Sequence, residues 1–333
     1  MIRISCHSIY LTVLLFFGFA SSGCNFRPNP EQEVISPVVQ PLELPKSDSL
    51  QPVKILFTGD YSEGVVVDRD GNIYFSHGKV ITMVTSDGGH RVWAETGAPN
   101  GHKILADGTH LVCDASHHAV LRLDSKGNMM EPASQECDGK ALRAPNDISV
   151  DVDGGFYFTD PGGSDASNPI GTIHYVGPSG KTYLVAGGLA FPNGIVLLPN
   201  QQSLLVAESK KNRILLYEVL SPGRVGPMKI FADLPSKAGE QIGNEPDGMC
   251  LDVDGNLYVA HNGMRQIQVL DPSGRLIRRY SGGNLTTSNC AFGGPKLDQL
   301  FVTGGHPGAL FRLDLGVAGL DIRPKKQQPG APG

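Results

Sequence analysis

The chain has 333 residues and a formal net charge of −5, from 28 basic and 33 acidic side chains. No run of Lys and Arg forms the basic patch that nucleic-acid-binding proteins carry, so we expect no nucleic-acid partner. The 42 glycines and 24 prolines indicate many turns, and the length is enough for one large all-β domain.

Residues 1–23 are predicted to be a targeting segment. Arg3 supplies a small positive charge, and the apolar run "IYLTVLLFFGF" at 9–19 is too short to span a bilayer. The run is followed by "ASSGC", which resembles a bacterial lipoprotein cleavage site with Ser21 in place of the usual Leu and Cys24 as the lipidated residue. Cleavage as an ordinary secretory signal is the alternative. Either way we expect an exported protein; in a bacterium it would be a periplasmic or cell-envelope lipoprotein that contacts the membrane only through its lipid anchor.

Two further segments lack a strand pattern. Residues 24–52 are rich in proline and are predicted to be a linker. Residues 319–333 are predicted to be a disordered tail. The region between them, 53–318, carries the patterned strands and is predicted to be the folded domain.

One sequence unit recurs six times in that region. Copies such as "EGVVVDRDGNIYFSH" and "DGMCLDVDGNLYVAH" contain a strand, a turn and a returning strand. The copies start 37 to 54 residues apart, at Glu63, Asn100, Asn146, Asn193, Asp247 and Asn289. This period suits four-stranded blades, so the six copies predict an all-β fold, a six-bladed β-propeller.

The six starting residues all carry side-chain oxygen atoms. Because the innermost strand of each propeller blade lines the central channel, these side chains should converge at one mouth of that channel. Asn and Asp also favour turns, which is the simpler explanation for any single position. For six positions in register, however, two carboxylates among neutral amides match the oxygen ligands of a divalent cation such as Ca²⁺, Mg²⁺ or Mn²⁺.

A second set of polar positions follows from the same register, where each returning strand ends. These positions hold His77, Asp114, Asp160, Glu208 and His261, and Gly304 in the sixth copy. They are either solvated strand ends or a polar mouth that contacts a substrate, and Asp160 or Glu208 is an alternative to Asp247 as general base. Arg143, three residues before Asn146, is either a surface arginine or a contact for an anionic or hydroxylated ligand.

Four cysteines lie in the predicted domain: Cys113, Cys137, Cys250 and Cys290. Cys113 and Cys250 lie in or beside apolar strand patterns, which is typical of buried thiols. A disulfide is permitted in an exported protein, but the spacing of the cysteines does not select a pair. No Cys-x-x-Cys or His/Cys metal-binding pattern is present in the sequence.

The repeat motifs resemble the senescence-marker-protein/gluconolactonase/luciferin-regenerating family, also called regucalcin-like. The matching stretches are "SEG" at 62–64, "DGKALRAPNDISVDVDGGFYFTDP" at 138–161, "FPNGIVLLPNQQSLLVAES" at 191–209, "PDGMCLDVDGNLYVAH" at 246–261 and "SNCAFGG" at 288–294. Together they span nearly all of residues 60–315. The chain departs from the family pattern at Val65, where proline is usual, and in "GGSDASNP" after "TDP", which changes the expected pocket rim.

The resemblance implies a six-bladed propeller that holds one divalent metal ion and hydrolyses sugar lactones or related cyclic esters. Carried over by motif, the metal ligands would be Glu63, Asn193 and Asp247, and Asn146 would lie near the metal or the substrate. The resemblance also implies an acid/base role for Asp247. Ca²⁺ is the expected ion, with Mg²⁺, Mn²⁺ or Zn²⁺ as alternatives.

We therefore predict a metal-dependent lactonase, a carboxylic ester hydrolase that opens a small sugar lactone. Asn100, Arg143 and Asn146 are predicted to contact the substrate, Asn146 also to bind the metal, and Asp247 to be catalytic. One alternative is an exported, non-catalytic propeller binding module with a structural divalent ion. Another is a paraoxonase-like hydrolase of lipophilic lactones or phosphotriesters. The sequence leaves open the lactone, the native metal, the general base and the oligomeric state.

Overall fold

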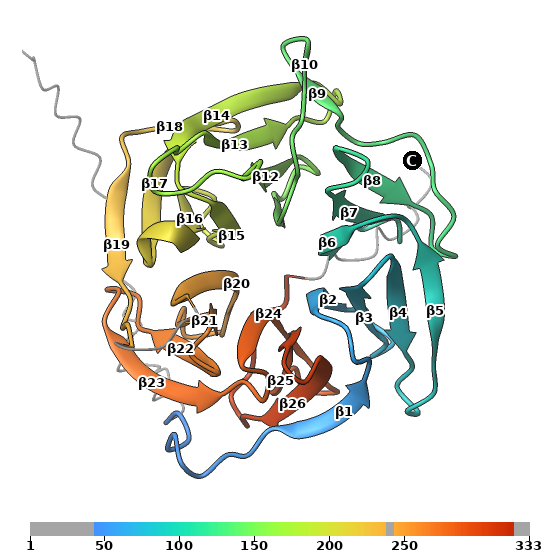
Figure 1. Cartoon of the computed structure of the whole chain (residues 1–333), viewed down its shortest axis with the longest axis vertical. Coiled ribbons are helices and arrows are strands. Elements are labelled where there is room, and N and C mark those ends of the chain that lie inside the picture. Colours follow the sequence, from blue (N-terminus) through green and yellow to red (C-terminus); the bar gives the residue numbers. More distant parts are fainter. Residues whose placement is uncertain (1–42, 238–242, 323–333) are drawn as a thin grey trace, which may run out of the picture. The chain divides into compact units, whose positions relative to one another are not determined.

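The computed structural model describes residues 43–237 and 243–322. The predicted targeting segment 1–23, the greater part of the predicted linker and residues 323–333 lie outside these ranges. The all-β prediction is confirmed, because the only helix in the described part of the chain is the single 3₁₀ turn η1 (Ser209–Lys211). Within the described ranges, no helix is long and apolar enough to cross a membrane. Antiparallel sheets surround a common axis (Figure 1).

The first two sheets contain seven strands. The first sheet consists of β2 (Ser62–Val67), β3 (Ile73–His77), β4 (Val80–Val84) and β5 (His90–Glu95). The second sheet consists of β6 (Pro99–Ile104), β7 (His110–Asp114) and β8 (Ala119–Leu123). A two-stranded hairpin follows, formed by β9 (Glu136–Cys137) and β10 (Lys140–Ala141).

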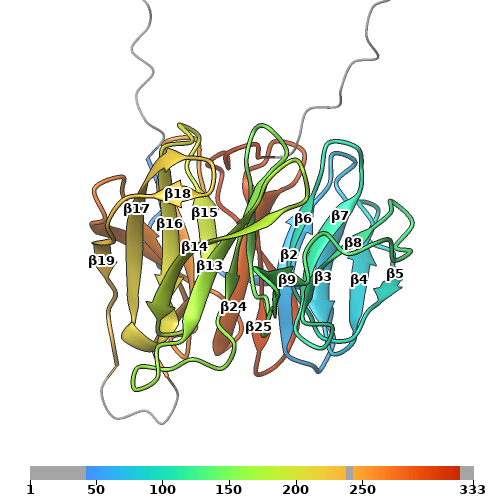
Figure 2. The same ribbon diagram turned by 90° about the horizontal axis from the view of Figure 1, so that it is seen from above.

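The third and fourth sheets repeat the same antiparallel order. The third sheet consists of β11 (Ile148–Val150), β12 (Phe156–Asp160), β13 (Gly171–Val176) and β14 (Thr182–Leu189). The fourth sheet consists of β15 (Pro192–Leu197), β16 (Ser203–Glu208), β17 (Arg213–Ser221), β18 (Arg224–Val225) and β19 (Lys229–Asp233). In the view of Figure 2, the long strands of neighbouring sheets lie roughly along a common axis.

The remaining strands form one eight-stranded sheet. It consists of β20 (Glu245–Leu251), β21 (Leu257–Asn262), β22 (Gln266–Leu270), β23 (Leu276–Ser281), β24 (Thr286–Gly293), β25 (Gln299–Gly305), β26 (Ala309–Asp314) and β1 (Val53–Phe57). Its two halves, β20–β23 and β24–β26 with β1, are joined by one residue pair, Asn262 with Thr286. The strand β1 pairs antiparallel with β26, so the start of the domain completes its last sheet.

Carboxylates hold the turns between the first two strands of several sheets. The Asp252 Oδ1 atom accepts hydrogen bonds from the backbone N–H groups of Asp254 (3.0 Å) and Asn256 (2.8 Å). Asp68 does the same for Asp70 and Asn72. Such local bonds fix the turn and therefore the register of the strands on either side.

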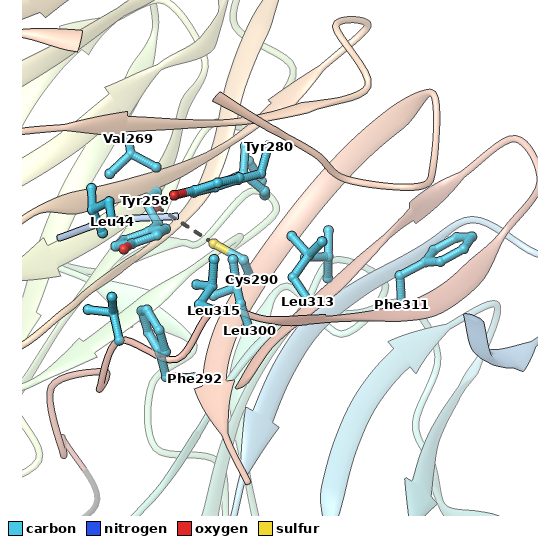
Figure 3. Close-up of a cluster of buried hydrophobic side chains, with 14 of the residues drawn as sticks. Leu44, Tyr258, Val269, Tyr280, Cys290, Phe292, Leu300, Phe311, Leu313 and Leu315 are labelled. Carbon is cyan, nitrogen blue, oxygen red and sulfur yellow. Dashed lines mark hydrogen bonds between the residues drawn. The ribbon is translucent and has the colours of Figure 1, made fainter. Parts of the chain in front are cut away.

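The hydrophobic core is distributed between neighbouring sheets. Figure 3 shows the cluster between the two halves of the eight-stranded sheet, where Tyr258 and Tyr280 face Cys290, Phe292 and residues of β25 and β26. Leu44 is buried in this cluster, and the hydroxyl of Tyr280 donates a hydrogen bond of 2.8 Å to the carbonyl oxygen of Pro45. The described end of the predicted linker therefore packs against the domain.

Candidate functional site

The six repeat-starting residues lie in or beside strands that contact one another in a closed cycle. The contacts run from β2 to β6, β11, β15, β20 and β24, and from β24 back to β2. Five of these strands, β2, β6, β15, β20 and β24, are labelled around the centre of the molecule in Figure 1. Asn146 lies two residues before β11, and the other five starting residues lie within their strands. The six starting residues, which are equivalent in the sequence repeat, therefore also form a ring in space.

A β-bulge interrupts five of these strands where the starting residue lies. The register of β2 with β3 shifts between Glu63 and Val66, and the register of β20 with β21 shifts between Pro246 and Met249. Equivalent shifts occur in β6, β15 and β24. A bulge releases a residue from regular pairing and redirects its side chain. The side chains of Glu63 and Asp247 therefore do not follow the alternation of apolar residues in their strands.

Glycines allow the starting residues of neighbouring strands to approach closely. A Cβ atom on Gly64 would lie 1.8 Å from the carbonyl oxygen of Asn100, and one on Gly194 would lie 2.2 Å from that of Asp247. Both distances are far below contact distance, so a side chain at either position would force neighbouring strands apart. The glycines of the "EG" and "NG" dipeptides therefore allow neighbouring strands of the ring to lie close together.

Hydroxyl groups add bonds between neighbouring sheets at the same level. Each donates to a backbone carbonyl at or beside the next starting residue, namely Ser76 to Asn100 (2.9 Å), Thr159 to Asn193 (2.7 Å), Ser209 to Pro246 (2.6 Å) and Ser288 to Ser62 (2.6 Å). These bonds hold the backbone of the ring residues in place between neighbouring sheets.

Two of the ring residues are acidic, and their carboxylates are close enough to repel each other. Burial, followed by repulsion from Glu63 and Asp147, raises the pKa of Asp247 well above its usual range. Burial and repulsion from Asp147 likewise raise the pKa of Glu63. The Asn193 side chain opposes part of this effect by a hydrogen bond to the Asp247 carboxylate.

Asp147 is a third buried carboxylate beside the ring, and the sequence analysis did not select it. Its Oδ1 atom accepts a hydrogen bond from the N–H of Ile148, its Oδ2 atom accepts one from Ile195, and the ammonium group of Lys103 lies 4.0 Å from Oδ1. Asp147 directly follows Asn146, but its side chain bonds to backbone groups of two sheets. The ammonium group of Lys103 therefore lies beside this third carboxylate.

Tyr61 is a second residue at the site that sequence reasoning missed. Its hydroxyl hydrogen-bonds the Glu63 carboxylate and accepts a bond of 2.9 Å from the amide of Asn262. Its ring lies against Gly305, where a Cβ atom would be 2.6 Å from the ring. Tyr61 is 42% exposed, so part of its side chain is open to solvent. Its position before the repeat unit gave no periodic signal.

The donor set fits a divalent cation. Glu63 Oε2 is buried and has no hydrogen-bond partner, which is costly for a carboxylate unless a cation binds it. Two carboxylates with the neutral amides of Asn146 and Asn193 form an all-oxygen set of the kind that Ca²⁺ or Mg²⁺ takes. In the part of the chain that the structure describes, no group of three or more His, Cys, Asp or Glu side chains is placed to hold a metal. A cation site in this ring would therefore need the amides as ligands.

The acidic residues of the second set are engaged by backbone groups. Asp160 accepts hydrogen bonds from the N–H groups of Arg143 (2.9 Å) and Ala144 (2.7 Å). Glu208 accepts one from Ala190 (2.9 Å) and forms an ion pair of 2.6 Å with Arg213.

Asp114 belongs to the same pattern. It accepts bonds from the N–H groups of Ala98, Ser116 and His117, and hydrogen bonds, with Thr96 first among them, lower its pKa to about 2. In each case the carboxylate holds the loop that leads into or out of its own sheet. The oxygens of these residues therefore have structural partners within the fold.

The remaining candidate contacts differ in their surroundings. Arg143 is exposed, and its guanidinium group donates a hydrogen bond to the carbonyl oxygen of Ile170. The aliphatic part of its side chain packs against Gly162. Arg143 therefore contacts the variant "GGSDASNP" loop. Asn100 is half-buried in the ring. The side chain of Asn289 is buried against Gly248 and accepts a hydrogen bond from its own neighbour Cys290.

Two surface hollows lie away from this ring. One, of about 770 Å³, lies along β22 and β23 and is lined by Ser47, Arg265 and Arg278 among others. The other, of about 590 Å³, lies between the turns near Asp153 and Gln201. Neither contains a ring residue, so the chemistry of the buried carboxylates, not hollow size, marks the candidate site.

The chain is similar to a family of known proteins. Residues 61–306 match the protein-family model described as "SMP-30/Gluconolactonase/LRE-like region". The chain is 27% identical to a gluconolactonase of Zymomonas mobilis, over 84% of this chain and 83% of that protein. It is 29% identical to the lactonase drp35 of Staphylococcus haemolyticus, over 72% of this chain and 74% of that protein. A gluconolactonase structure from Xanthomonas campestris superposes with a TM-score of 0.70 at 25% identity, covering 81% of this chain and 91% of the other.

Proposed function

The chain belongs to the SMP-30/gluconolactonase/LRE-like family, and on that premise we propose that it opens sugar lactones by metal-dependent hydrolysis. The observation that carries the proposal is the pair Glu63 and Asp247, whose carboxylates lie in one ring, are desolvated and are close enough for Glu63 to raise the pKa of Asp247. Relatives named as gluconolactonase and lactonase support the reaction class. We also infer six blades, since six inner strands close the contact cycle and the eight-stranded sheet divides into two halves.

We propose that Glu63, Asn146, Asn193 and Asp247 hold the cation. Four oxygen donors suit Ca²⁺ or Mg²⁺, and Ca²⁺ is the ion proposed. A divalent cation bound there would act as a Lewis acid that polarises the lactone carbonyl group and stabilises negative charge on its oxygen. Bonds between neighbouring sheets already hold the backbone of the ring in place for this task.

Asp247 is proposed to take the proton of the attacking water on a carboxylate oxygen. Asp160 and Glu208 are weaker candidates, because backbone N–H groups and Arg213 already occupy their oxygens. Asn193 orients the Asp247 carboxylate by a hydrogen bond. Asn100, Asn146 and Arg143 are proposed to contact the hydroxyl groups of the sugar lactone.

The experiment is an assay of the purified protein on glucono-1,5-lactone, with Ca²⁺ and with a chelator. We expect acid release above the spontaneous rate with Ca²⁺ and its loss with chelator. Asp247→Asn should lower kcat/KM by at least about 100-fold, in the range expected for loss of a general base. Asp254→Asn is the matched control, because Asp254 is exposed in the turn at the other end of β20.

Full activity of Asp247→Asn would overturn the assignment of Asp247. A fall in melting temperature with chelator but no turnover of any lactone would favour a binding module with a structural ion. Turnover of phosphotriesters or lipophilic lactones in preference to sugar lactones would favour the paraoxonase-like alternative.

We further propose export of the protein and lipidation of Cys24. The support is the sequence pattern alone: an apolar run that ends in "ASSGC". Fractionation of producing cells, with Cys24→Ala as the comparison, tests it. Release of the variant from the membrane fraction is expected, and an unchanged distribution contradicts the lipid anchor.

A further inference from the structure

Two cysteines from different halves of the eight-stranded sheet lie in contact. The Sγ atoms of Cys250 on β20 and Cys290 on β24 are 3.5 Å apart. Cys290 is buried and points toward Tyr258 in Figure 3, and Cys250 packs against the same cluster. The other two thiols of the described chain have different surroundings: Cys113 lies in another core cluster, and Cys137 faces the carbonyl oxygen of Thr182. The structure therefore selects the pair that the sequence spacing did not.

The backbone keeps the two sulfur atoms together. β21 is hydrogen-bonded to β20, with Cys250 opposite Tyr258, and it also pairs with β24 at its end. The thiol of Cys290 lies 3.6 Å from the carbonyl oxygen of Tyr258. Next to the pair, Gly248 packs so closely on Asn289 that a Cβ atom there would be 2.3 Å from the Asn289 side chain. The proximity of the thiols thus follows from strand packing on both sides of them.

We propose that Cys250 and Cys290 are an oxidation site that forms an intramolecular disulfide. The oxidant is a low-molecular-weight disulfide or the disulfide of a thiol oxidoreductase. One cysteine, as the thiolate, attacks a sulfur of that disulfide, forming a mixed disulfide and releasing one thiol. The second cysteine then attacks the mixed disulfide, which forms the Cys250–Cys290 bond and releases the second thiol. The protein loses two electrons and two protons, and the oxidant gains them. The sulfur atoms need to approach from 3.5 Å to a bond length of about 2.05 Å.

The environment of the pair predicts when the bond forms. Burial, and next the hydrogen bond with Cys290, raise the pKa of the Cys250 thiol well above its usual range. Little thiolate is then present in the folded protein, and exchange with external thiols or disulfides is slow. We therefore expect the disulfide to form while the chain folds under oxidising conditions and to resist reduction afterwards.

The position of the pair gives the bond a role in the ring. Cys250 follows Asp247 by three residues on β20, and Cys290 directly follows Asn289 on β24. The disulfide would join the two halves of the eight-stranded sheet beside a catalytic carboxylate. Because the bond closes a loop of 40 residues, it would also reduce the conformational freedom of the unfolded chain.

The test is peptide mapping of the full-length protein after folding with oxidised glutathione or with dithiothreitol. Free thiols are alkylated in denaturant without reduction, and the protein is digested with trypsin. We expect peptide 238–265 linked to peptide 280–296 only after oxidative folding, with Cys113 and Cys137 alkylated in both samples. Alkylation of both Cys250 and Cys290 after oxidative folding would overturn the proposal, and so would pairing of either with Cys113 or Cys137.

A stability measurement gives an independent readout. The oxidised protein should melt at least about 5 °C above the reduced protein. Cys290→Ala should melt at the same temperature after either treatment, whereas Cys113→Ala, which keeps the pair, should retain the difference. Equal melting temperatures for both forms of the wild type would contradict the stabilising role. Neither readout depends on lactonase activity, so the result is separate from the proposed function.

Discussion

The hydroxyl of Tyr61 bonds to the carboxylate of Glu63, one of the two acidic residues of the ring. The same hydroxyl accepts a hydrogen bond from Asn262 at the end of β21, so Tyr61 ties the first sheet to the eight-stranded sheet across the site. Hydrogen bonds to metal-binding carboxylates commonly set their orientation and their affinity for the ion. This relationship makes Tyr61 a positioning residue for Glu63.

Tyr61→Phe should therefore weaken Ca²⁺ binding by about 10-fold without unfolding the protein. The aromatic ring of the phenylalanine can still pack on Gly305, and only the hydrogen bonds to Glu63 and Asn262 are lost. Calorimetric titration with Ca²⁺ measures the affinity, and kcat/KM at saturating Ca²⁺ separates ion binding from catalysis. Tyr183→Phe is the matched control, because Tyr183 is exposed on β14 away from the ring. Unchanged Ca²⁺ affinity in Tyr61→Phe would remove the positioning role.

Gly194→Ala should destabilise the protein by about 1–3 kcal/mol, the usual cost of overpacking. The added methyl group would meet the carbonyl oxygen of Asp247 at 2.2 Å, and that atom belongs to backbone and cannot swing aside. Activity should also fall, because β20 would have to shift together with the Asp247 side chain. Gly187→Ala provides the comparison, since its nearest neighbour would be Thr172 at 3.5 Å. Urea unfolding of both variants measures the difference, and equal stabilities would show that the ring tolerates expansion.

Glu208→Gln should reduce stability by about 3 kcal/mol and leave kcat much less affected than Asp247→Asn does. The substitution leaves the Arg213 guanidinium without its buried anionic partner at 2.6 Å. Chemical denaturation and lactonase assays below the unfolding transition separate the two effects. A loss of kcat as large as that of Asp247→Asn, in a variant that remains folded, would instead identify Glu208 as the base.

Buried histidines predict a loss of stability in mild acid. Burial lowers the pKa of His261 to about 4 and that of His110 to about 4, from 6.5 for the ordinary side chain. The unfolded chain therefore binds more protons than the folded protein between these values. The contribution of both residues is fully present above about pH 6.5 and is lost progressively as the pH falls toward 4.

The measurement is the free energy of unfolding between pH 8 and pH 5, with saturating Ca²⁺ throughout. His261→Gln can retain the hydrogen bond to Asn212 but cannot take up a proton, so its stability should fall less steeply below pH 6.5. Parallel curves for the wild type and His261→Gln would show that His261 does not contribute to the acid dependence.

The sequence was informative wherever the repeat extends. Glu63, Asn193 and Asp247 each precede a glycine and begin a strand that returns after a turn, so their equivalence was visible from spacing alone. The structure agrees, because five of the six inner strands carry a bulge at the repeat-starting residue. The roles of Asp160 and Glu208 were not predictable in this way. Their polarity was visible, but their backbone partners lie 16 to 18 residues away in the chain.

The sequence by itself determined the all-β fold, the register of the ring and its oxygen-rich chemistry, because these follow from a local pattern repeated along the chain. Only the tertiary structure decided which other groups meet the ring. Tyr61 reaches Asn262, Lys103 approaches Asp147 and Cys250 meets Cys290 through contacts between different sheets or between the two halves of one. Such contacts join residues 40 or more positions apart and depend on how neighbouring sheets pack, which no local periodicity encodes.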